Sequence, residues 1–231
     1  MSLTIHTVGT STIYREAERA IVALHVASDG ENQSEISQNV TKTSNQIQSL
    51  LRHISPQTAD SDERTTPDAA IAFWSMSSLR TGSYRPWDSA RNEHKERVYT
   101  AQTDFEIKFR NFDQLNQFAT EVASDALVSV ESVRWKLTDK ARQEVGRECR
   151  KQAVGDAMAK AKDYASALDK ENVVPVLIDD TESFSSSLYG IQCAPRAAAF
   201  GAHSGDDYQA LSFVPDKCEV QCSVKMQFRV D

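Results

Sequence analysis

Hydrophobic and polar residues alternate without interruption over residues 218–230, near the end of the chain. Cysteine, valine, methionine and phenylalanine occupy every second position, and polar or charged residues lie between them. Successive side chains of a β-strand point to opposite faces of a sheet, so this pattern predicts a strand with one buried face. Residues 98–110 end in the same alternation and predict a second strand of this kind.

Five shorter segments complete the set of about seven predicted strands. Residues 20–28 are nearly continuously apolar, which favours a strand that is covered on both of its faces. The other four predicted strands lie at 5–11, 69–79, 127–137 and 174–180.

Three segments predict helices. Apolar residues recur at helical spacing over 33–53, which predicts an amphipathic helix lying on a sheet. Residues 111–124 predict a short helix with Asn111 as its N-cap. A long third helix is expected to begin after Thr138 or Asp139 and to end near Asp169.

The third helix carries an unusual stripe of alanines at every fourth position, which forms one narrow face: Ala153, Ala157, Ala161 and Ala165. A face of methyl groups allows another surface to approach closely. That surface is expected to be the protein's own sheet, with a helix of a neighbouring subunit as the alternative. Lys160 and Lys162 are expected to point away from the alanine face as solubilising charges.

The order of the elements, β-β-α-β-β-α-β-α-β-β, does not alternate strictly between strands and helices. It predicts an α+β fold with a mainly antiparallel sheet of about seven strands packed against three helices. The 231 residues are expected to form a single domain over 1–231. Two segments interrupt this domain, an insertion loop at about 80–97 and a mobile loop at about 180–214.

Composition narrows the classes of partner. Hydrophobic residues make up 40% and charged residues 26% of the chain, which is ordinary for a soluble globular protein. The net charge of -7 argues against nucleic acid as a partner, because such proteins usually present a basic face. No stretch approaches the roughly 20 apolar residues of a membrane span, and no apolar segment follows a basic start. The sequence therefore predicts no signal peptide, no membrane partner and a cytoplasmic or nuclear location.

Candidate catalytic and metal-binding residues are few. On a strand, Cys218 and Cys222 lie about 13 Å apart, too far for one zinc ion or a disulfide, so both are expected to be buried thiols. The histidines show no metal-binding spacing, and His25 is expected to be a hydrogen-bonded residue of its strand. Residues 201–207, "GAHSGDD", lack the strand–turn–helix context of a nucleophile and predict a surface loop. No catalytic residue, metal ligand or cofactor is predicted.

Residues 80–97 are the strongest candidate for a partner-binding segment. Tyrosine, tryptophan and arginine are the usual hot-spot residues of protein interfaces. As a long insertion, the segment is expected to reach a neighbouring subunit or another protein. The alternative is a solvated loop whose aromatic side chains fold back on the domain. The candidate partner-binding residues are Arg80, Tyr84, Arg85, Trp87 and Arg91.

Four segments of the chain resemble a known family in their order and spacing: "IHTVGTSTIYREAERAIVALHV", "VYTAQTDFEIKFRNFDQL", "RKQAVGDAMAKAKDYASAL" and "VPDKCEVQCSVKMQFRV". They are similar to the opening strands, the central strand, the alanine-rich helix and the closing strand of the SIMPL domain family. This family is also called the 26-kDa periplasmic immunogenic protein family and was formerly described as a domain of unknown function. The chain departs from the family pattern at Ser11, Ala17, Glu18 and Val98.

The resemblance implies an α+β fold and assembly into rings or larger oligomers. Animal members resemble adaptors that associate with a Pelle-like kinase, and no catalytic constellation is established for the family. The expected function is therefore non-enzymatic, through self-assembly and protein–protein interaction, as an adaptor or scaffold. The alternative is a small-molecule binding protein or enzyme with a site between subunits, lined for example by Tyr84, Arg85, Asp88 and His94.

Overall fold

The computed structural model describes residues 3–55, 69–90, 92–180 and 212–231. Within these ranges it contains ten strands and three helices, arranged in antiparallel sheets. The predicted α+β class is confirmed. The described chain divides into two compact units, unit 1 and unit 2, and the single domain over 1–231 stays a prediction.

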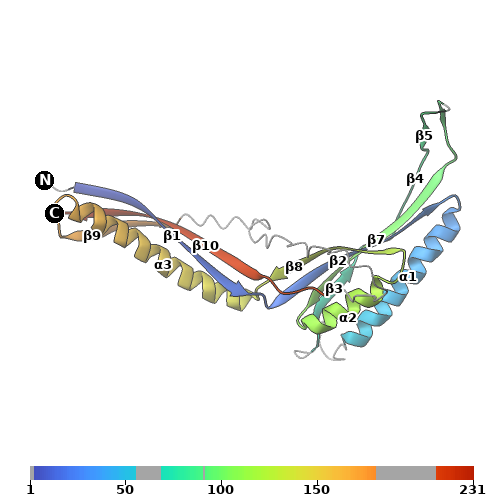
Figure 1. Cartoon of the computed structure of the whole chain (residues 1–231), viewed down its shortest axis with the longest axis horizontal. Coiled ribbons are helices and arrows are strands. Elements are labelled where there is room, and N and C mark those ends of the chain that lie inside the picture. Colours follow the sequence, from blue (N-terminus) through green and yellow to red (C-terminus); the bar gives the residue numbers. More distant parts are fainter. Residues whose placement is uncertain (1–2, 56–68, 91, 181–211) are drawn as a thin grey trace, which may run out of the picture. The chain divides into compact units, whose positions relative to one another are not determined.

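Unit 1 is a three-stranded antiparallel sheet with one long helix on it (Figure 1). Across the sheet the strands follow the order β1 (Leu3–Glu16), β10 (Lys217–Val230) and β9 (Val173–Asp180). Strands β1 and β10 pair in one unbroken register along their whole length. Every second residue of β10 is buried or nearly so, as the alternation predicted, and this face meets helix α3 (Asp139–Ser166).

The alanine stripe of α3 packs on the unit's own sheet, which confirms the first of the two predicted alternatives. The four alanines are at most 1% exposed and share a core with β10 residues such as Met226 and Phe228. At Gly9 the backbone of β1 lies directly against the backbone of the helix. A Cβ atom added at Gly9 would lie 1.9 Å from the carbonyl oxygen of Ala153, so only glycine fits there.

Polar side chains also attach α3 to β1. The Thr7 hydroxyl donates to the carbonyl of Ala157 (3.2 Å), and Lys160 Nζ donates to the carbonyl of Val8 (2.9 Å). Lys160 therefore contacts β1, and the prediction that it points away into solvent is wrong. Asp156 accepts from Lys160 Nζ (2.6 Å) and from the Thr10 N–H (2.9 Å). These bonds, Lys160 first, hold the pKa of Asp156 below its ordinary value of 3.8.

Unit 2 contains the larger sheet, in which β3 (Ile71–Met76), β7 (Val98–Phe109), β2 (Arg19–Gly30) and β8 (Val128–Lys136) lie in that order. Strand β4 (Arg80–Tyr84) also pairs with β7, at the end of β7 that β3 leaves free.

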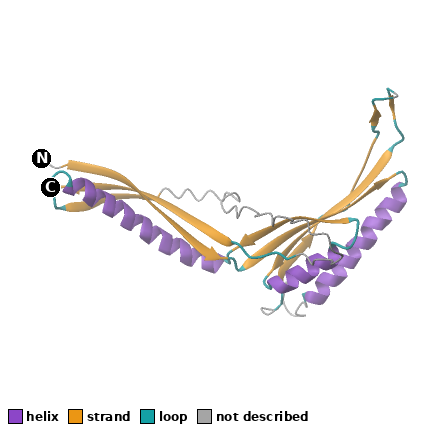
Figure 2. Ribbon diagram, in the orientation of Figure 1, coloured by secondary structure: helices purple, strands orange, loops and turns teal. Residues whose placement is uncertain are grey.

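Helices α1 (Gln33–Ile54) and α2 (Phe112–Val122) lie on the same face of this sheet (Figure 2). Both predicted helices are confirmed, and so is the N-cap Asn111, whose side chain accepts from two backbone N–H groups. Phe105, Ile107 and Phe109 of β7 are buried on the helix side, at most 2% exposed.

Two predictions about strands are wrong. The face of β2 away from the helices is only half-buried at Ala23, His25 and Ala27, so β2 is not covered on both sides. Residues 80–97, expected to be an insertion loop, contain β4, β5 (Trp87–Asp88) and β6 (Glu93–His94), which raises the number of strands above seven. An exposed strand has no apolar face, so it shows no alternation in the sequence.

Most of the loop predicted at 180–214 falls outside the described residues. Within the described ranges, no helix is both long enough and apolar enough to span a membrane.

Candidate functional site

The described part of residues 80–97, called the arm below, forms a ribbon of short, largely exposed strands at one end of the sheet of unit 2. Strand β4 pairs with β7 from Arg80 opposite Gln102 to Tyr84 opposite Val98, and β5 pairs with β6. Strand β2 pairs with the other side of β7 as far as Gly30, opposite Tyr99, so β4 is an edge strand of the sheet up to this point. Beyond it the arm continues past the end of α1 (Figure 1). Only β5 and β6 form a separate two-stranded sheet, and such a sheet is marginally stable in water, because it has little core of its own.

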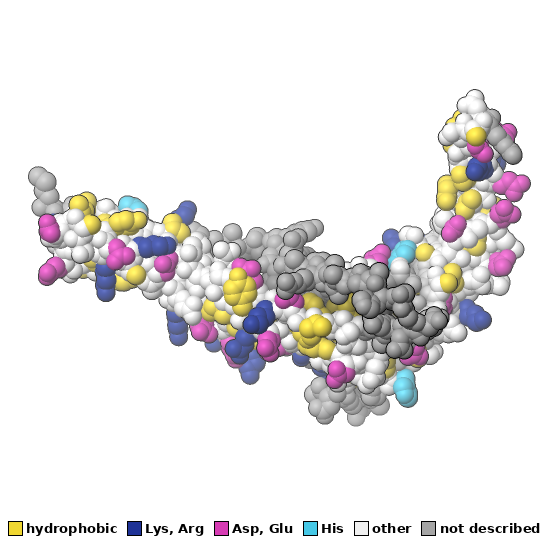
Figure 3. All heavy atoms as spheres, viewed as in Figure 1, with side chains coloured by type: hydrophobic (Ala, Val, Ile, Leu, Met, Phe, Trp, Pro, Cys, Tyr) yellow, Lys and Arg dark blue, Asp and Glu magenta, His cyan; other side chains and the backbone are white. Residues whose placement is uncertain are grey.

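The side chains of the arm are largely exposed. All five residues of β4 are exposed, and Tyr84 and Trp87 retain 54% and 53% of their accessible surface. The ring of His94 packs edge-on against Trp87, with centroids 4.8 Å apart. Figure 3 shows hydrophobic and charged side chains together on the surface of this ribbon. By sequence the arm has five Lys or Arg and three Asp or Glu residues, a net charge of +2 in a chain of -7.

A cluster around Asp104 holds the base of the arm. His25 lies directly opposite Asp104 in the β2–β7 register, and its Nδ1 is 2.7 Å from Asp104 Oδ1. Arg80 donates to the other carboxylate oxygen, while the hydroxyl of Ser77 accepts the backbone N–H of Asp104 (2.9 Å). The prediction that His25 is a hydrogen-bonded strand residue is confirmed. In this cluster Asp104 is the residue that contacts both His25 and Ser77. In a catalytic triad the histidine lies between the serine and the aspartate, so this arrangement is not that of a serine nucleophile beside its histidine base.

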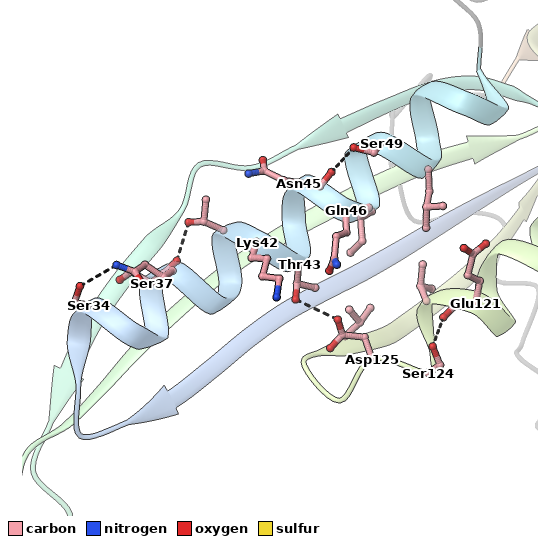
Figure 4. Close-up of a pocket in the computed structure, with 16 residues that line it drawn as sticks. Ser34, Ser37, Lys42, Thr43, Asn45, Gln46, Ser49, Glu121, Ser124 and Asp125 are labelled. Carbon is pink, nitrogen blue, oxygen red and sulfur yellow. Dashed lines mark hydrogen bonds between the residues drawn. The ribbon is translucent and has the colours of Figure 1, made fainter.

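A second surface feature of unit 2 is an open groove between α1 and α2, with a volume of about 1110 Å³. Lys42, Thr43 and Gln46 project from α1 towards Glu121 and Asp125 at the end of α2 (Figure 4). Ile47, Leu50, Val122 and Val128 supply the apolar part of the lining.

Some polar side chains of the groove are already hydrogen-bonded within the chain, and others are not. Asp125 accepts from the Thr43 hydroxyl (3.2 Å) and from the backbone N–H of Leu127 (2.9 Å), so it mainly joins α1 to the turn after α2. Among the described residues, Lys42 and Glu121 have no side-chain hydrogen-bond or ion-pair partner. These two charged groups are available to a bound molecule.

The fold and these surfaces can be compared with known proteins. The model of the SIMPL family, described as a protein of unknown function (DUF541), matches residues 5–228, nearly the whole chain. The chain belongs to the SIMPL family. None of the curated proteins matches it.

In this SIMPL protein, the predicted partner-binding residues share the arm. Tyr84, Arg85 and Trp87 are exposed, so the aromatic side chains do not fold back on the body of unit 2. The guanidinium group of Arg80 forms an ion pair with Asp104 at the base of the arm. Arg91 and the segment 201–207 lie outside the described residues.

The four residues named for an intersubunit ligand site do not converge in the single chain. Tyr84, Arg85 and His94 are exposed on the ribbon, and Asp88 pairs with Lys95 at 3.7 Å. Among the described residues, no three His, Cys, Asp or Glu side chains lie together as metal ligands would. Cys218 and Cys222 are buried thiols, as predicted.

The sequence did not predict the groove or its charged residues, Lys42 and Glu121. A signal was present in α1, because its surface positions are mostly Ser, Thr, Asn and Gln and carry few charges. A surface helix usually carries a more strongly charged outer face. Taken alone, however, each helix is simply amphipathic, and the groove arises only where the two lie on one sheet.

Proposed function

We propose that this SIMPL protein acts by binding other proteins through its arm, further copies of itself included, as an adaptor or scaffold and not as an enzyme. The observation that carries the proposal is the arm itself, a ribbon with little core that displays Tyr84, Arg85 and Trp87 to solvent. A homo-oligomer, a protein partner and a cytoplasmic location stay predictions.

The energy available from the arm is sufficient for recognition. A tyrosine or tryptophan side chain buries about 150–250 Å² when it is fully covered. About half of that area is still exposed on Tyr84 and on Trp87. At about 25 cal/mol per Å², covering the exposed part contributes roughly 2–3 kcal/mol for each ring. Two such rings with neighbouring arginines have the composition of an interface hot spot.

The test compares the solution mass of the intact chain with that of two variants, by light scattering after size exclusion. One variant has residues 80–97 replaced by a short turn, and the other is the double substitution Tyr84→Ser with Trp87→Ser, which keeps the ribbon. We expect the intact chain to be multimeric and both variants to have lower mass. If the intact chain and both variants have the same mass and retain the same proteins in a pull-down, the arm is not the binding element.

A further inference from the structure

We infer that the groove between α1 and α2 of one copy receives the arm of a second copy of this chain. The inference rests on the proposed function and names the partner of the arm. Both surfaces belong to unit 2, and their chemistry is complementary in polarity and charge.

The lining of the groove suits the side chains that the arm displays. Apolar residues from both helices lie beside hydroxyl and amide groups of α1. Tyrosine and tryptophan have the same mixed character, an apolar ring with one polar group that seeks a hydrogen-bond partner. Ser37 and Gln46, which line the groove, carry hydroxyl and amide groups that can supply such partners. Tyr84 and Trp87 can therefore be covered without leaving their polar groups unpaired.

The charges are also complementary. The groove contains two carboxylates and one ammonium group, from Glu121, Asp125 and Lys42. The arm has a net charge of +2, whereas the rest of the chain carries -9. Arg85, next to Tyr84 in the sequence, is an exposed cation for which Glu121 is the available counter-ion. Complementary charges of this kind favour the correct partner and speed its association.

A second copy is needed because the arm does not lie in the groove of its own unit. Figure 1 shows the arm continuing past the end of α1, away from α2. At its tip, β5 and β6 pair with each other. The arm and the groove are two different surfaces of unit 2, so contact between them in two copies is heterologous. Such contacts join successive copies, unless two copies exchange arms and form a closed dimer.

A charge exchange tests the inference on the full chain. Arg85→Glu places a negative charge on the arm, and Glu121→Arg places a positive charge in the groove. Each variant alone brings like charges together, so we expect its self-association to weaken about tenfold or more. In an equimolar mixture, the reversed arm meets the reversed groove and the native arm meets the native groove, so the multimer is expected to return.

Two matched substitutions control for the change in net charge. Lys162→Glu on α3 and Glu131→Arg on β8 make the same exchanges at exposed positions outside the arm and the groove, and both are expected to leave the mass unchanged. Self-association is measured by light scattering over a range of protein concentrations, with the mixture and each single variant at equal total concentration.

The outcomes separate this inference from the proposed function. If shortening the arm dissociates the multimer but the charge variants do not, or if the mixture fails to restore it, the arm binds elsewhere and the groove is not its site. If the intact chain is monomeric at every concentration, the second copy is not the occupant. Retention of a protein by the intact chain but not by the shortened chain would then still support the proposed function.

Discussion

Replacing Gly9 by alanine measures how closely α3 lies on β1 in unit 1. The added Cβ would lie 1.9 Å from the carbonyl oxygen of Ala153 and 2.8 Å from both the backbone nitrogen and the Cβ of Ala157. Ordinary contacts of a Cβ atom begin near 3.4 Å. Because two of these neighbours are backbone atoms, no rotamer change relieves the clash, and the strand and helix must separate by about 1.5 Å.

The loss in the free energy of unfolding follows from the packing contacts and hydrogen bonds that this separation disturbs. Overpacking of a close-packed contact typically costs about 1–3 kcal/mol. The separation also stretches the bonds that Thr7 and Lys160 make across the same contact, and a hydrogen bond contributes about 0.5–1.5 kcal/mol net. We therefore expect Gly9→Ala to lower the free energy of unfolding by about 2–6 kcal/mol, out of a total of about 5–15 kcal/mol for a typical protein.

Gly155→Ala is the matched control, because Gly155 lies on the exposed side of the same helix. A Cβ added there meets nothing within 4 Å. In a helix interior, alanine is more stable than glycine by about 0.5–1 kcal/mol, so this variant should be more stable than the wild type. Urea denaturation followed by far-UV circular dichroism gives both values. A Gly9→Ala variant within about 0.5 kcal/mol of the wild type would refute the close approach of α3 to β1.

The remaining predictions concern single side chains. Asp156 has a lowered pKa in the folded protein, so its carboxylate stabilises unit 1 above its ordinary pKa of 3.8, and this contribution is lost as the pH falls through the folded pKa. Asp156→Asn should flatten the acid limb of the stability profile, and an unchanged limb would contradict this assignment. Asn32→Ala removes the acceptor for the N–H groups of Ser34 and Glu35 and should lower the free energy of unfolding, measured by thermal denaturation, by about 1 kcal/mol. A decrease of less than about 0.3 kcal/mol would argue against the cap. Asp104→Asn should speed amide hydrogen exchange at the base of the arm, and equal protection in both proteins would show that the cluster does not hold it.

The elements that could be predicted from the sequence are those whose signal is local. The alternation in β10 identifies its buried face, since each residue's environment depends on its own position along the strand. Helix caps behave in the same way, because Asn111 accepts from N–H groups two and three residues further on. The spacing of the alanines in α3 identified one close-packed face, although not the strand that it would meet.

The features that could not be predicted depend on residues far apart in the chain. Gly9 and Ala153 are separated by 144 positions, and neither segment alone shows that a carbonyl oxygen occupies the space beside the glycine. Strand β4 was missed because its side chains are exposed on both faces. The groove was missed because Lys42 and Glu121 belong to two helices that are unremarkable one at a time.

The register between β1 and β10 has a consequence for synthesis on the ribosome. Strand β1 is made first among the elements, but its partner in the sheet of unit 1 is β10, the last of them. Strand β10 is also the central strand, so β9 cannot join the sheet without it. The elements of unit 2 lie between β1 and α3 in the chain, and they can pair while the ribosome is still adding later residues. Unit 1 must wait for its final strand, and its long-range pairing predicts that it folds more slowly than unit 2.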